Sequence, residues 1–469
     1  MPNSLLTLAL ITALVAAISI WLSPRARTIG SFYGGQDADG GAPSVLALTF
    51  SQVTTWIFAR SILNAAILGY FFGIAGALAY AAYYLSFFTG AWIIASLRFR
   101  HGFSSVQDFM DARFGLAGTA SYNFVVGVRL LSEVFANLLV IGLIFGTDGS
   151  LAYTVSIVAV GLVTLGYSLV GGLNASIRTD VFQMALFLVA TGLLMVVAVG
   201  TGSFDVARIV ASSPDALSPG WVLLAVALLQ VVSYPMHDPV MMDRGFIADK
   251  RTTMASFYHA GWLSFVCIMA FGLLGVWAGL NQLPGETFVP TLSRLIGEPA
   301  MLLFNAALVI SCMSTLDSTF SSSAKLAVVD MRMGAPTVGN GRIAMAAFFI
   351  GGLAMVFLGS KDLFEAVAVS GTASMFLAPV ILFSLWGGRT DVPVWSLLVA
   401  FLAAMAAAIL YFTESSGYSN ILGPLTGYSH KYTKLLVLSA GVLVVGCGAF
   451  ALGIAAGSPR NSMPVKGGA

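Results

Sequence analysis

Apolar segments of about 20 residues recur along the whole chain, separated by short polar stretches. A helix of about 20 apolar residues is long enough to cross a bilayer, so this pattern predicts about thirteen membrane-spanning helices. No linker is long enough for a soluble domain. We therefore expect one all-α, polytopic membrane domain over residues 1–456 and a short cytoplasmic tail over 457–469. The expected spans are 4–22, 44–69, 71–97, 119–146, 152–169, 179–200, 220–241, 257–280, 300–324, 343–359, 363–386, 393–412 and 435–456.

The composition supports a membrane protein. Hydrophobic residues make up 58% of the chain and charged residues 9%, with a mean hydropathy of +0.91, whereas an ordinary soluble domain has about 25% charged residues. The net charge of +2 and the lack of basic blocks or Cys/His groupings indicate neither a nucleic-acid partner nor a zinc site. The first span has no charged leader and no small-residue cleavage site, so we interpret it as a retained helix. Three cysteines lie in apolar segments and predict no disulfide: Cys267, Cys312 and Cys447.

The distribution of basic residues predicts the orientation. With the N-terminus outside, fifteen of the 22 Lys and Arg residues fall on the inner side and five on the outer side, and Arg60 and Arg129 lie within helices. Basic residues are enriched in cytoplasmic loops. The chain is therefore expected in the plasma (inner) membrane, with an outside N-terminus and a cytoplasmic C-terminus.

The spans divide into two blocks of five, over residues 44–200 and 220–386. Five is odd, so the blocks must have opposite orientations, and inverted repeats are typical of transporters with a site at broken helices. The first span of each block carries a candidate break. Residues 51–55 interrupt one span with polar groups, and residues 233–239 place two prolines in the other. Ordinary helix kinks are the alternative.

A polar stripe marks the ninth span. At 100° per residue, seven oxygen-bearing residues share one helix side. Hydroxyls alone could bond back to their own helix, but an acid at bilayer depth usually marks an ion or substrate path. Oxygen-only ligands suit a hard cation such as sodium. The stripe consists of Ser311, Ser314, Thr315, Asp317, Ser318, Ser321 and Ser322.

Three motifs make the chain similar to the sodium:solute symporter family. Residues 171–183 resemble the family's entry to the sixth span, and residues 311–318 resemble its ninth-span cation motif. Asp238-Pro239 with Arg244 resembles the end of its seventh span, and residues 32–35 are a weaker likeness. This resemblance implies a LeuT-type fold with a five-plus-five inverted repeat, one helix before the core and two after it.

The resemblance also implies a sodium site. The carbonyls of Phe50, Val53 and Ser311 and the hydroxyls of Ser314 and Thr315 would bind the ion. A second cation site is expected from Asp180, Ser314, Asp317 and Ser318. The alternatives are that Asp180 caps its helix and that Asp317 pairs with Lys325.

The solute is expected between the two broken helices, near Gln52, Trp56, Tyr234 and His237. Gln52 stands where the proline-transporting relatives have a carboxylate, which favours a polar or zwitterionic solute and disfavours proline. His237 could instead be a histidine satisfied at a helix end. For Arg60 we favour an ion pair with Glu133 over a substrate role, and Arg129 with Glu133 is expected as a local pair.

The sequence therefore predicts a sodium-coupled secondary transporter working by alternating access, and no enzyme. Its expected partners are a small solute, sodium and the lipid bilayer, with a monomer as the functional unit. Proton coupling, or a sensor of the same fold that binds solute without transport, is the alternative. A membrane enzyme would need paired acids or a nucleophile at a helix mouth, and Asp108 with Asp111 is too little for that.

Overall fold

The computed structural model describes residues 2–37, 39–358 and 363–457, and the regular structure in these ranges is helical throughout. The predicted tail from residue 458 onward, with Arg460 and Lys466, and the basic residue Lys361 lie outside the described residues. The first half of the chain forms α1 (Pro2–Leu22), α2 (Ile29–Gly34), α3 (Val45–Trp56), α4 (Ala59–Ala82), η1 (Tyr83–Leu85), α5 (Ser86–Ile94), η2 (Ala95–Arg100), α6 (Val106–Phe145), α7 (Leu151–Gly200) and α8 (Val206–Val210). The second half forms α9 (Pro219–Gln230), η3 (Tyr234–His237), α10 (Pro239–Arg244), α11 (Lys250–Leu280), α12 (Phe288–Lys325), η4 (Leu326–Asp330), α13 (Val338–Leu358), α14 (Leu363–Ser374), α15 (Leu377–Pro379), η5 (Val380–Trp386), α16 (Val394–Ser415), α17 (Leu422–Thr426) and α18 (Lys431–Ala455).

Within the described residues, nine helical segments are long and apolar enough to cross a membrane. Two of them, Ala59–Arg100 and α7, each hold two of the predicted spans or large parts of them. The shorter apolar helices Pro219–Gln230 and Leu377–Trp386 fall in the predicted seventh and eleventh spans. The structure is thus an all-helical, multi-pass membrane protein. The count of thirteen stays a prediction, because helix length does not say where each crossing ends.

The predicted fifth and sixth spans form one element with a break. Gly172 has φ 55° and ψ −142°, a backbone conformation that a side chain would disfavour. A Cβ atom there would also lie only 2.4 Å from the carbonyl oxygen of Phe32 in α2. Gly172 therefore both interrupts α7 and lets α2 pack against it. Comparable breaks lie at Gly73, Gly115 and Gly297 in α4, α6 and α12.

Both expected helix breaks exist, although the first lies later than predicted. Residues 51–55 are helical, and α3 continues to Trp56 before Ile57 and Phe58 leave the helical path. The prediction of a break at 51–55 is therefore wrong by a few residues, because Thr55 bonds back to the Ser51 carbonyl and so remains helical. The seventh span breaks as expected, since α9 ends at Gln230 and α10 begins at Pro239.

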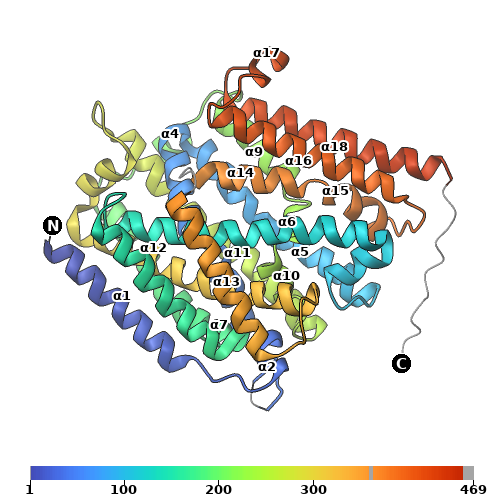
Figure 1. The fold of residues 1–469 in the computed structure, drawn as a ribbon. Coiled ribbons are helices and arrows are strands. Elements are labelled where there is room, and N and C mark those ends of the chain that lie inside the picture. The colour runs from blue at the N-terminus through green and yellow to red at the C-terminus, as the bar shows by residue number, and fades with distance from the viewer. Residues whose placement is uncertain (1, 38, 359–362, 458–469) are drawn as a thin grey trace.

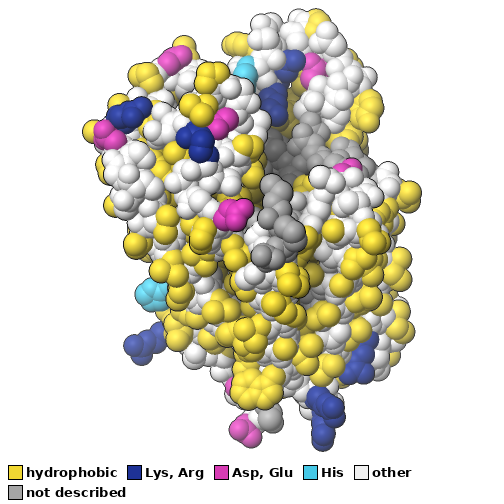
Figure 2. All heavy atoms as spheres, turned by 90° about the vertical axis from the view of Figure 1, so that its left-hand side faces the viewer, with side chains coloured by type: hydrophobic (Ala, Val, Ile, Leu, Met, Phe, Trp, Pro, Cys, Tyr) yellow, Lys and Arg dark blue, Asp and Glu magenta, His cyan; other side chains and the backbone are white. Residues whose placement is uncertain are grey.

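The arrangement places α12 against α7, α6, α3 and α10, so the polar stripe lies inside the helix bundle. Figure 1 shows α16 and α18 side by side along one edge, with α1 at the opposite edge. On the face in Figure 2, hydrophobic side chains cover the middle, and most Lys, Arg, Asp and Glu side chains lie toward its two ends. This distribution suits a protein surrounded by lipid.

A glycine seam joins α4 and α11, which pack along much of their lengths. A Cβ atom at Gly275 would lie 1.9 Å from the carbonyl oxygen of Ala66, and one at Gly279 would lie 2.4 Å from that of Tyr70. Neither position can hold a larger residue unless the helices separate. Small residues are how membrane helices achieve such close backbone contact.

One polar cluster lies beyond the apolar part of α16. Glu414 accepts hydrogen bonds from the backbone N–H groups of Ile421, Leu422 and Gly423 and from Lys434 Nζ, which is 2.7 Å away. These donors, Lys434 foremost, lower the pKa of Glu414 to about 2. The ionised carboxylate therefore ties the loop before α17 to the ends of α16 and α18.

We expect Glu414→Gln to speed amide hydrogen exchange at Ile421, Leu422 and Gly423. Because the folded pKa is below the usual value of about 4.3, this stabilisation is fully present above that pH and is lost as pH falls toward 2. The difference in exchange between variant and wild type should shrink over that range. Glu298→Gln, at an exposed position, is the control. An equal difference at pH 2.5 and pH 7 would contradict this account.

Candidate functional site

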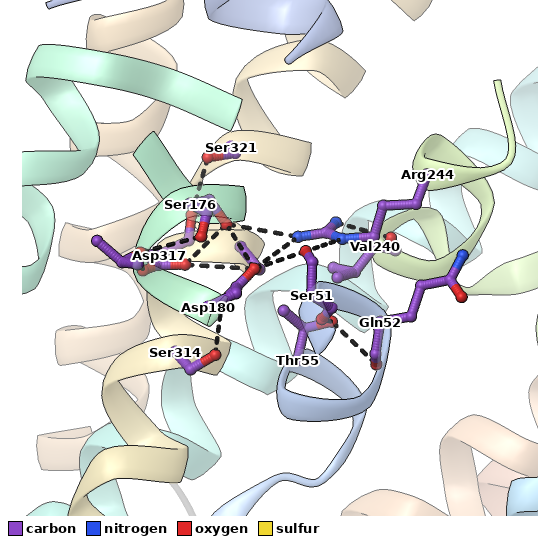
Figure 3. Close-up of polar contacts among 12 residues, drawn as sticks. Ser51, Gln52, Thr55, Ser176, Asp180, Val240, Arg244, Ser314, Asp317 and Ser321 are labelled. Carbon is purple, nitrogen blue, oxygen red and sulfur yellow. Dashed lines mark hydrogen bonds and ion pairs between the residues drawn. The ribbon is translucent and has the colours of Figure 1, made fainter. Parts of the chain in front are cut away.

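The stripe on α12 forms the floor of a buried polar cluster, as the sequence predicts. Its hydroxyls and carboxylate meet groups from α3, α7 and α10 (Figure 3). We call the set Ser51, Ser176, Asp180, Arg244, Ser314, Asp317 and Ser318 the acid cluster. Each of these side chains is at most 1% exposed.

Asp180 joins three helices in the acid cluster. Ser51 on α3 donates a hydrogen bond of 2.6 Å to Asp180 Oδ2, and Ser314 on α12 donates one of 2.6 Å to Oδ1. Arg244 lies 3.5 Å from Oδ2 as an ion pair. Asp180 lies inside the part of α7 that follows the break at Gly172 and not at either end of it, so the alternative that it caps a helix is wrong.

Within the described residues, the hydrogen bonds to the Asp317 carboxyl group come from hydroxyls. Tyr167 and Thr179 lie 2.9 Å from Oδ2, while Ser176 lies 2.8 Å from Oδ1. The alternative pairing of Asp317 with Lys325 is wrong, since Lys325 bonds instead to Asp243 and Asp330. Lys325 lies two helical turns beyond Asp317, and those two acids near the end of α12 are closer to it.

Arg244 brings a guanidinium into the cluster that sequence reasoning did not place there. Its Nε donates to Ser51 Oγ at 2.8 Å, and Nη2 donates to Ser318 Oγ at 2.7 Å. The acid cluster thus holds two buried carboxyl groups and one guanidinium, and the guanidinium forms its ion pair with Asp180. Such an environment favours an additional cation.

Residues of the expected sodium site lie around the break between α3 and α4. The Ser311 hydroxyl donates to the carbonyl oxygen of Ile57, which belongs to the break itself. The Thr315 hydroxyl donates to the Ser311 carbonyl at 2.9 Å, and the Val53 carbonyl accepts from the Ile57 N–H at 2.9 Å. Phe50 is half-buried on the same helix. The candidate ligand atoms are all oxygens, and all but those of the half-buried Phe50 belong to buried residues. Such oxygens at a helix break suit a hard cation.

Two contributors were missed by sequence reasoning. In the sequence, Tyr167 is a single tyrosine within an apolar segment, and such a residue usually serves in packing. Ile57 takes part through its backbone, and no side-chain pattern reveals a free carbonyl. Tyr167 lies opposite the stripe because Gly172 bends α7 between it and Asp180.

The expected solute residues divide into two groups. Trp56 and Tyr234 contact each other at right angles, with ring centroids 5.6 Å apart, and Tyr234 contacts His237 at 4.6 Å. Both His237 ring nitrogens have protein partners, the Tyr234 carbonyl and Ser370 Oγ, which fits the satisfied-histidine alternative. Gln52 is buried and directs its amide away from the acid cluster (Figure 3).

A second set of charges lies beside these aromatic residues. Glu133 pairs with both Arg60 and Arg129, which confirms both expected ion pairs. Arg129 also reaches Asp238 at 2.9 Å, and Asp238 caps the start of α10. We call these four residues the charge network. Its two positive and two negative charges cancel.

Curated proteins and solved structures both show likeness to this chain. No protein-family model matches the sequence. A Drosophila melanogaster protein named as a sodium-dependent multivitamin transporter is 28% identical over 168 residues, which cover 35% of this chain and 27% of that protein. The match thus spans about a quarter of the relative's length.

The solved structures match over nearly the whole chain. A Na⁺-coupled sialic acid symporter in an outward-open state gives a TM-score of 0.70 at 15% identity, covering 98% of this chain and 99% of its own. Mhp1, a nucleobase-cation-symport-1 transporter, gives 0.56 at 15% identity, covering 93% and 96%. MhsT in complex with L-phenylalanine gives 0.53 at 14% identity, covering 87% and 98%. At such identities the likeness establishes the fold.

The fold that the three motifs imply is therefore confirmed over nearly the whole chain. The chain is an all-helical membrane protein with the LeuT-type fold, and it resembles the sodium:solute symporters.

Proposed function

We propose that this chain is a secondary transporter that couples sodium entry to uptake of a small polar or zwitterionic solute. The observation that carries the proposal is the meeting of the α12 hydroxyl stripe with the break between α3 and α4, where Ser311 bonds to Ile57. A cation there would contact both helices at once. It would bind more tightly when the helices are together, and that difference in affinity couples ion binding to a change of state.

Within this proposal, sodium binds to the carbonyls of Phe50, Val53 and Ser311 and to the hydroxyls of Ser314 and Thr315. Thr315 and Ser314 each donate their proton to a protein acceptor, so oxygen lone pairs stay available for a cation. Asp180, Asp317 and Ser318 are proposed to form a second cation site. Arg244 already contacts Asp180 and Ser318, so a cation bound there would compete with its guanidinium for these oxygens.

The solute is proposed to bind beside Trp56 and Tyr234, between the two broken helices. Gln52 supports this location, because its buried amide nitrogen and oxygen have no partner among the described side chains and backbone. A buried amide without partners is costly. A polar group of the solute would satisfy it.

The protein is proposed to lie in the plasma membrane as a monomer, with its N-terminus outside. The basic-residue asymmetry supports this orientation. In this orientation, the ion-paired cluster of Asp243, Lys325 and Asp330 would lie near the cytoplasmic ends of α10 and α12.

The proposal is tested with purified protein in proteoliposomes. A screen of small metabolites by thermal shift, in sodium chloride and in choline chloride, finds solutes that stabilise the protein only with sodium. Their labelled forms should then accumulate under an inward sodium gradient. Accumulation under a proton gradient alone would establish proton coupling instead. Binding without counterflow would indicate a sensor, and a chemically changed solute would indicate an enzyme.

A further inference from the structure

We propose that the solute carries a carboxylate, held by Arg60 and Trp56 inside an aromatic cage; this inference rests on the proposed transport function. The cage is a small cavity formed by the broken end of α3 together with α4, η1 and η3. It is lined by Trp56, Phe58, Arg60, Ser61, Tyr80, Tyr83, Tyr84 and Tyr234.

The cage walls are aromatic rings in mutual contact, most of them edge to face and some tilted. The centroid of the Trp56 ring lies 6.4 Å from that of Phe58, 5.5 Å from that of Tyr84 and 5.6 Å from that of Tyr234. It also lies 5.1 Å from the ring centroid of Phe87, which does not line the cage. The free volume is about 20 Å³, close to the space one water occupies. A solute must therefore displace a ring to enter, and its body must be small and apolar or aromatic to pack against these faces.

Among the described residues of the cage wall, the buried polar atoms without a hydrogen-bond partner are all donors. Three tyrosine hydroxyls already donate to protein acceptors: Tyr80 to Ser61, Tyr83 to Gln230 and Tyr84 to the Trp56 carbonyl. Trp56 Nε1 and Arg60 Nε and Nη1 are buried without a partner within the described parts of the chain. Arg60 is 1% exposed, and its bond to Glu133 uses Nη2. An acceptor-only ligand fits this set, and a carboxylate has two oxygens that can accept hydrogen bonds from Arg60 and Trp56 together.

The balance of charges in the charge network favours binding of an anion together with a cation. The charge network is neutral without a ligand, since Glu133 and Asp238 balance Arg60 and Arg129. A carboxylate adds one negative charge, and one sodium ion beside Ile57 cancels it. Ile57 lies between Trp56 and Phe58 of the cage, and its carbonyl accepts from Ser311 of the proposed sodium site. Cage and ion site are therefore adjacent, and each ligand lowers the charge cost of the other.

The test compares acids with their amides, which keep shape but lose the charge. Thermal shift of the full chain in sodium chloride and in choline chloride is measured with propionate and propionamide, and with benzoate and benzamide. At least one acid should stabilise the protein only in sodium, and its amide should not. Labelled uptake of that acid in proteoliposomes should follow the same preference.

Two variants locate the effect. Arg60→Gln should abolish the response to the acid, and Trp56→Phe, which keeps the ring and removes one N–H, should weaken binding about tenfold. Trp277→Phe is the matched control, because Trp277 Nε1 donates to Ser203 outside the cage. If Arg60→Gln fails to fold, Trp56→Phe still decides the question.

The outcomes separate the two proposals. Acids and amides that bind equally, or sodium-dependent uptake of neutral solutes only, would overturn the carboxylate assignment and leave sodium symport intact. A protein that responds to no solute in a sodium-dependent way would overturn the transport proposal, and the carboxylate assignment with it.

Discussion

Replacing Ser314 by alanine or Thr315 by valine is expected to raise the sodium concentration for half-maximal uptake by about tenfold or more in each variant. Each change removes one oxygen from a dry, buried site where water cannot take its place, a loss of about 1–3 kcal/mol. A factor of ten corresponds to about 1.4 kcal/mol. Thr315→Val keeps the shape of the side chain, so packing on α12 is preserved. The measurement is initial uptake rate against sodium concentration in proteoliposomes.

Thr319→Val provides the matched control. Thr319 lies one turn further along α12 and donates to the Thr315 carbonyl at 2.7 Å, just as Thr315 donates to Ser311. This variant should leave the sodium dependence close to that of wild type. If all three variants shift the sodium requirement alike, the effect comes from the helix and the assignment of the ion site is wrong.

Arg244→Gln is expected to have the largest effect on stability. It leaves Asp180 buried without its ion pair and close to a second buried carboxyl group, Asp317. Breaking a buried ion pair costs about 3–5 kcal/mol. The melting temperature should fall sharply in choline chloride and recover in large part in sodium chloride, because sodium can then neutralise the carboxylates. Adding Asp317→Ser to the variant should also recover stability, now in both salts.

Arg98→Gln is the control for this experiment. Arg98 is a neighbouring arginine that donates to the Gly245 carbonyl at 2.9 Å and touches neither carboxylate of the acid cluster. Its loss should have a small effect that is the same in both salts. A fall in melting temperature for Arg244→Gln that sodium does not reduce would remove the support for a second cation site.

The helix periodicity of α12 was predictable from sequence and proved sufficient for much of the site. Ser311, Ser314 and Ser318 do face other helices in the bundle, because their spacing places them on one side of a regular helix. The partners on α7 followed from a motif and not from spacing. Nothing in the local pattern says that Asp180 lies opposite Ser314, since this depends on how two distant helices pack.

Helix ends were less predictable than helix faces. Polar residues at 51–55 suggested a break, yet Thr55 satisfies its hydroxyl within the helix, and the chain leaves α3 only after Trp56. Around Gly172 the opposite holds, because helical structure extends from both sides up to the break itself and so fills most of the interval between the predicted spans 152–169 and 179–200. In both places, whether the helix continues depends on whether its backbone groups find hydrogen-bond partners. A hydropathy pattern carries no information about such partners.

The glycine seam between α4 and α11 limits how the molecule can change shape in a transport cycle. The backbones are so close at Gly275 and Gly279 that the helices cannot slide past each other without a steric clash. We therefore expect them to move together as one rigid unit. Displacement is left to the contacts among α3, α7, α10 and α12, where hydroxyls can exchange one partner for another at little cost. The non-helical residues Ile57 and Phe58 connect this rigid unit to α3, so we expect the hinge of the motion at these two residues.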